Sequence, residues 1–157
     1  MSGPADFAFE LVDAVVDRLN ADLDDRAPLG EKAVGFLEPP TKTQRFRVVC
    51  YALADEPAAS VGGASASVQR VTSRIGVAFV VRASKSGGRA RAKTRTGELL
   101  KIARERLVGW TPPVAGADSP LAWDRGQLEE IDEDGRAFWA DRYSIEWVLD
   151  SQSFRGA

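Results

Sequence analysis

Alternation between apolar and polar residues is the feature that most constrains the fold of this chain. Within 68–82, the side chains of one face are mostly apolar, whereas Arg70, Thr72 and Arg74 occupy positions of the other face. A period of two places neighbouring side chains on opposite sides of a β-strand. The pattern therefore predicts one long strand with a buried face and a polar face.

A second alternating stretch indicates a hairpin in the last third of the chain. Residues 121–131 and 136–150 are strand-like runs, and the acidic segment between them ends in Asp134-Gly135, a dipeptide favoured in tight turns. In the later run, aromatic and aliphatic side chains share one face, and Arg142 shares the other with Ser144 and Glu146.

Two helices are predicted from a longer period. Within 4–20, apolar side chains follow the spacing of one helical face. A second helix is expected to begin with Thr94 or Thr96 as its N-cap. It is expected to end at Gly109, which can adopt the left-handed conformation, before two prolines that cannot continue a helix.

Shorter apolar runs at 32–39 and 45–54 predict two further strands, so the order is helix, strands, helix, hairpin. This order favours an α+β fold, in which two helices pack on one face of an antiparallel or mixed β-sheet. The length of 157 residues is that of one domain, expected to cover 1–157. Mobile loops are predicted near 20–31, 54–66 and 83–93.

The amino-acid composition argues against several classes of protein function. Hydrophobic residues make up 44% and charged residues 28%, as in ordinary globular proteins, and no apolar run reaches the roughly 18 residues of a membrane span. The N-terminus shows no signal-peptide pattern, so synthesis in a cytoplasm is expected. Histidine is absent, which removes the commonest general base and metal ligand. The single cysteine, Cys50, lies in an apolar run and is expected to be a buried hydrophobe rather than a nucleophile.

Charge is strongly segregated along the chain, although the net charge is only −2. Residues 82–113 hold nine Lys/Arg against two acids, a net of +7, and residues 114–150 hold ten acids against three arginines, a net of −7. Separated patches of opposite sign allow a subunit to pack head to tail with copies of itself and close into a ring. The simpler interpretation is that these are solvated faces.

Other interpretations of the charged segments are weaker. The basic run at 82–95 is compatible with a nucleic-acid-binding loop, but it contains no aromatic residue for base stacking. Glu130, Asp132, Asp134 and Asp141 partly match a calcium-binding loop, but the flanks are strand-like, which favours an acidic hairpin turn. No motif specifies a catalytic group, a metal or a cofactor, so an enzyme of undefined chemistry is the weakest alternative.

The motifs, taken in order, resemble those of the tail terminator-like proteins of tailed bacteriophages. The resemblance runs over roughly 7–150 and is carried by four segments: "FELVDAVVDRL", "RVTSRIGVAFVVR", "GELLKIARERLVGWTPP" and "PLAWDRGQLEEIDEDGRAFWADRYSIEW". In that family a long strand leads through a polar loop into a helix closed by "GWTPP"-like residues. A hairpin with an "R-G-x-L" strand then follows.

The resemblance implies a non-enzymatic subunit of a ring, usually a hexamer, in the virion. Such a ring sits at the head-proximal end of the tail, stops polymerisation of the tail tube and joins the head. Its partners would be other copies of itself, the tail tube protein and a head-tail connector or head-completion protein, with no membrane and with DNA only passing through the channel. Within the same particle, a head-completion or tube-adaptor subunit is the alternative, and outside it a small DNA-binding module.

The family's role and the segregated charge together give the candidate site. Ten charged residues are expected at a subunit interface or at the lumen of the ring, with the acidic hairpin on a face complementary to the basic segment. The basic candidates are Arg82, Lys85, Arg89, Arg91, Lys93 and Arg95, and the acidic candidates are Glu129, Glu130, Asp132 and Asp134.

Overall fold

The computed structural model describes residues 7–21, 33–36, 48–58, 68–82, 88–114, 116–131 and 136–150. They form the elements α1 (Phe7–Asn20), β1 (Ala33–Phe36), β2 (Val48–Pro57), β3 (Val68–Arg82), α2 (Gly88–Leu107), β4 (Ala122–Ile131) and β5 (Arg136–Asp150). The loop predicted near 20–31 lies almost entirely outside these ranges.

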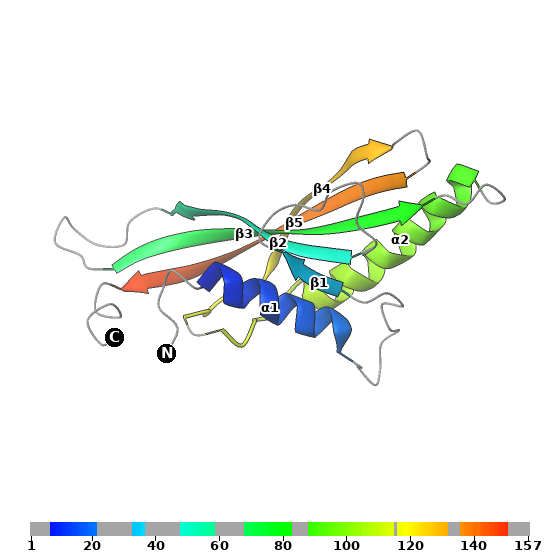
Figure 1. Ribbon diagram of the computed structural model, residues 1–157. Coiled ribbons are helices and arrows are strands. Elements are labelled where there is room, and N and C mark those ends of the chain that lie inside the picture. Colours follow the sequence, from blue (N-terminus) through cyan, green and yellow to red (C-terminus); the bar gives the residue numbers. More distant parts are fainter. Residues whose placement is uncertain are drawn as a thin grey trace.

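The strands form one mixed sheet in the order β1-β2-β3-β5-β4 (Figure 1). Only β1 and β2 are parallel, and the other neighbours are antiparallel. The two long strands β3 and β5 pair along their whole length, from Val68 opposite Asp150 to Arg82 opposite Arg136. The predicted strand over 68–82 and the predicted hairpin are therefore confirmed.

Both helices pack on the same face of the sheet, as predicted, and one hydrophobic core joins them to it. The apolar stripe of α1 is buried, and Phe7 at its start stacks on Trp147 of β5 with ring centroids 4.3 Å apart. Cys50 is buried in the same core, and this burial raises the pKa of its thiol to about 12. The thiol is thus neutral at pH 7, in keeping with the structural role expected for it.

The opposite face of the sheet carries a small buried apolar cluster, formed by Val49, Tyr51 and Ala78, and it also carries polar ties between strands. Arg74 of β3 pairs with Glu56 of β2, and its Nε lies 3.7 Å from Asp124 of β4. Ser144 of β5 donates a hydrogen bond of 2.7 Å to the same Asp124. Polar side chains thus link four neighbouring strands at the level where β2 and β3 extend past β1.

Strand β2 extends further than the sequence predicts and includes the beginning of the loop expected near 54–66. It continues to Pro57 in register with β3, and the ion pair of Glu56 with Arg74 ties the two strands there. Since β1 pairs only with residues 48–51 of β2, Pro57 lies at an edge of the sheet that the described residues form, where a strand tolerates proline. Residues 59–67 lie outside the described ranges.

Helix α2 begins earlier than predicted. It begins at Gly88 rather than at Thr94 or Thr96, so most of the mobile loop expected near 83–93 is helical. The reason is that residues 89–93 are Arg, Ala and Lys, which have high intrinsic helix propensity. The threonines suggested an N-cap, but the preceding residues continue the helix equally well. None of the helices in the described ranges is long and apolar enough to cross a membrane.

Two arginines join the C-terminal ends of α1 and α2 by hydrogen bonds. The buried side chain of Arg106 on α2 donates hydrogen bonds of 3.2, 2.9 and 2.8 Å to the carbonyls of Arg18, Leu19 and Ala21 at the end of α1. In return, Arg18 Nε donates a bond of 3.1 Å to the carbonyl of Arg106. Each cation thus satisfies carbonyls that a helix end leaves unpaired, where the helix dipole also favours positive charge.

We expect Arg106→Met to lower the free energy of unfolding by about 2 kcal/mol or more, because it keeps the buried stem but removes charged hydrogen bonds to three carbonyls. The measurement is urea unfolding followed by tryptophan fluorescence. Lys101→Met on the exposed side of the same helix is the control and should change stability by less than about 0.5 kcal/mol. Equal effects of the two substitutions would contradict the role given to Arg106.

Candidate functional site

The segment that ends α2 folds back toward α1. Gly109 has a φ of +80°, the left-handed conformation expected of a residue that follows a helix. Its N–H donates a bond of 3.0 Å to the carbonyl of Leu121, and Leu121 N–H donates one of 2.9 Å to the carbonyl of Trp110. The Trp110 ring lies against α1, where the Arg18 guanidinium is 5.3 Å from the ring centroid. The helix stop therefore serves to position Trp110 and the prolines after it.

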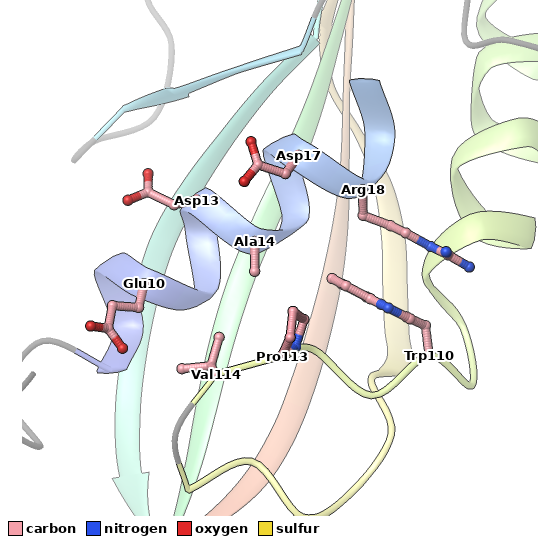
Figure 2. A pocket seen from close by; sticks show the side chains of 8 residues that line it. All are labelled: Glu10, Asp13, Ala14, Asp17, Arg18, Trp110, Pro113 and Val114. Carbon is pink, nitrogen blue, oxygen red and sulfur yellow. The ribbon is translucent and has the colours of Figure 1, made fainter. Parts of the chain in front are cut away.

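An open groove of about 680 Å³ lies between α1 and this segment (Figure 2). On the segment side it is lined by Trp110, Pro113 and Val114, and on the helix side by Ala14 and Arg18. Three carboxylates continue the helix side, those of Glu10, Asp13 and Asp17. The groove is thus lined by apolar side chains, three acids and one arginine.

A buried carboxylate fixes α2 on the hairpin. Asp141 of β5 is fully buried and accepts two hydrogen bonds of 2.8 Å from Arg104 of α2. It also accepts bonds from Trp139 Nε1 at 2.9 Å and from the Tyr143 hydroxyl at 3.3 Å. The hydrogen bond to Asp141 raises the pKa of Arg104, and burial together with the nearby carboxylate raises the pKa of Tyr143. The Asp141 carboxylate is thus bound by side chains of the fold itself, and it holds α2 on the hairpin.

Gly126 of β4 leaves room for this cluster. A Cβ placed there would lie 2.5 Å from Asp141 Oδ1 and 2.8 Å from Arg104 Nη2. Beside it, Trp123 is 44% exposed, and the Arg104 guanidinium lies 4.8 Å from its ring centroid. Leu128, two residues beyond Gly126, is also exposed. The outer strand of the sheet thus presents large apolar side chains to solvent.

A family model described as phage tail terminator protein matches residues 41–153, more than half of the chain. The chain belongs to the phage tail terminator family. Among solved structures, a chain of the "Virion of native gene transfer agent (GTA) particle" has a TM-score of 0.62 to this protein at 17% identity, covering 91% of this chain and 98% of that chain. At that identity the likeness shows a shared fold. Comparison with curated proteins finds no match.

The family match makes this chain a structural component of a phage tail. The matched range includes α2, the groove segment 110–114 and both strands of the hairpin, whereas α1 and β1 precede it. The "GWTPP" segment and the "R-G-x-L" strand that carried the resemblance have physical roles here. The first forms a wall of the groove, and the glycine of the second accommodates the Arg104–Asp141 pair.

Three of the predicted basic residues, Arg89, Arg91 and Lys93, lie in a helix rather than in the loop expected near 83–93. Arg82 ends β3, and Arg89, Arg91, Lys93 and Arg95 lie in the first half of α2. Of their side chains, the structure describes that of Arg95, which is partly buried and lies 3.4 Å from Glu98 Oε2. Lys85 lies outside the described residues.

Of the predicted acidic residues, Glu129 and Glu130 lie near the end of β4, and Asp132 and Asp134 fall outside the described ranges. The register sets Arg82 opposite Arg136, so the acidic hairpin and the basic end of β3 lie at the same end of the sheet. The role of these ten residues in assembly remains a prediction. Asp141, the last position of the partial calcium motif, is bound to Arg104 instead.

Sequence reasoning missed three residues that hold the helices in place, although the sequence carries a signal for two of them. Asp141 occupies an inward position of the alternating strand between Trp139 and Tyr143, where an acid requires a buried partner. Arg106 falls on the apolar stripe of α2, next to Leu107. Arg104 has no comparable signal, because its side chain reaches Asp141 from a half-exposed position of the helix.

We expect Gly126→Ala to destabilise the protein by about 1–3 kcal/mol, because its methyl group would displace Asp141 or Arg104 from a packed site. The measurement is the free energy of unfolding in urea. Gly97→Ala on α2 is the control, since nothing lies within 4 Å of an added Cβ and alanine favours the helix. A Gly126→Ala protein as stable as the Gly97→Ala protein would refute the packing argument.

Proposed function

We propose that this tail terminator protein forms a ring of six copies at the head-proximal end of a phage or phage-like tail. The ring ends polymerisation of the tail tube and presents the surface to which the head joins. The observation that carries the proposal is the family match over residues 41–153. The fold shared with a chain of a gene transfer agent virion supports it.

Features of the chain support a ring subunit. A ring built by head-to-tail contacts needs two unlike lateral surfaces on every copy. The acidic groove beside α1 and the basic first half of α2 are unlike in charge and belong to different parts of the molecule. Exposed Trp123 and Leu128 on the outer strand add apolar surface that an assembly could cover.

The ten predicted charged residues are assigned to the subunit interface or to the lumen. In the ring, basic residues of β3 and α2 that face the channel would line the path of DNA, which is the one nucleic acid partner we propose. The protein partners are neighbouring copies, the tail tube protein and a connector or head-completion protein. The subunit acts through assembly in the bacterial cytoplasm and carries out no catalytic reaction.

The experiment that tests the function is the length distribution of tails, measured by electron microscopy, after deletion of this gene from the particle that encodes it. We expect overlong or irregular tails without heads, because nothing stops the tube. Restoring the gene in trans is the control and should return tails to normal length. Tails of normal length beside unjoined heads would assign the protein to head completion instead, and intact infectious particles would contradict any structural role.

A further inference from the structure

We propose that the groove between α1 and residues 110–114 receives the basic first half of α2 from a neighbouring copy of this chain. This contact rests on the ring proposed above and specifies which two surfaces meet in it. The argument uses the charge of the groove, the charge of the helix and the distance between them within one molecule.

The groove offers negative charge beside apolar surface. Glu10, Asp13 and Asp17 are spaced along α1, and no hydrogen bond or ion pair joins them to another residue that the structure describes. They outnumber the one cation of the lining, Arg18, whose side chain is held by the Arg106 carbonyl and the Trp110 ring. On the side of the groove formed by residues 110–114, Pro113 is exposed and Trp110 is partly exposed. Lys and Arg side chains match such a surface, because their alkyl stems pack on apolar groups while their charged ends reach carboxylates.

The first half of α2 has the complementary charge. Between Gly88 and Gly97 the helix carries four basic residues and no acid. The basic residues are Arg89, Arg91, Lys93 and Arg95. This is the most basic element of the fold, whereas the groove belongs to the part of the fold where α1 ends against α2.

The two surfaces cannot meet within one molecule. Arg106 binds the end of α1, and Gly88 lies 18 residues earlier in the same helix, which at 1.5 Å per residue is about 27 Å away. A continuous helix cannot fold its first half back onto its own C-terminal end. The first half of α2 that lies in the groove therefore belongs to another copy of the chain.

The contact is head to tail, because a groove on one copy meets a helix on the next. Such a heterologous contact closes into a ring when the rotation between copies is an integral fraction of a turn. A head-to-tail contact joins two separate surfaces of the subunit. The acidic hairpin is therefore less suited to receive α2 of a neighbouring copy, because it lies at the same end of the sheet as the start of α2. The groove supplies acidic surface in a different part of the subunit.

A reciprocal charge exchange tests the inference. One variant carries Asp13→Lys and Asp17→Lys in the groove, and the other carries Arg91→Glu and Arg95→Glu in the helix. Each variant alone brings like charges together, so we expect association at least about a hundredfold weaker than for the wild-type protein. An equimolar mixture restores opposite charges at both contacts and should form rings of alternating copies, detected by native mass spectrometry.

The control is Glu56→Lys with Glu146→Lys, which makes the same change in net charge as the groove variant but on the sheet face opposite the helices. It also removes two solvent-exposed ion pairs, with Arg74 and Arg70, so its folding is checked with that of the other variants. This variant should assemble like the wild-type protein. Circular dichroism establishes that each variant is folded. Rings formed by both exchange variants alone, or a mixture that fails to assemble, would overturn the inference.

The same experiment separates this inference from the proposed function. A wild-type protein that stays monomeric, both alone and in the presence of tail tubes, contradicts the ring itself. Wild-type rings that persist in both variants contradict only the contact between groove and helix. A groove variant that still forms rings but no longer binds tail tubes would make the tube protein the occupant, and this too would overturn the inference.

Discussion

The exchange of hydrogen bonds between Arg18 and Arg106 determines how the two helices lie relative to one another. Each arginine satisfies carbonyls at the end of the other helix, so the C-terminal ends of α1 and α2 are held together. Because α2 is one continuous helix, fixing its last turn also fixes the position of its first turn. The groove beside α1 and the basic half of α2 are thus kept apart in every copy, as a repeating head-to-tail contact requires.

A second polar contact holds α2 on the sheet. Asp141 lies inside the fold and binds Arg104, while Gly126 provides the space that the pair occupies. A buried carboxylate without its cation would be strongly unfavourable, so the pair specifies one placement of the helix over the hairpin. Fixed placement matters for a component of a symmetric assembly, since small errors in one subunit are repeated at every interface.

The sequence predicts the sheet well because its signals are local. The alternation over 68–82 and 136–150 defines β3 and β5 closely, and the apolar stripes locate both helices on one face. The start of α2 at Gly88 was missed because a basic run resembles a solvated loop when its neighbours in space are unknown. The groove could not be predicted, since it depends on Arg18 and Trp110 meeting across the fold. The charged residues of the candidate site are visible in the sequence, but which surfaces they oppose depends on the arrangement of several copies.

The most direct test of the account is the structure of the particle's neck determined by electron cryo-microscopy, with this chain located in the density. The account predicts a closed ring of this chain on the head-proximal end of the tail tube, with the first half of α2 of each copy lying in the groove beside α1 of the next. A ring in which that groove faces solvent would contradict the proposed contact. Density for this chain elsewhere in the particle would contradict the proposed function.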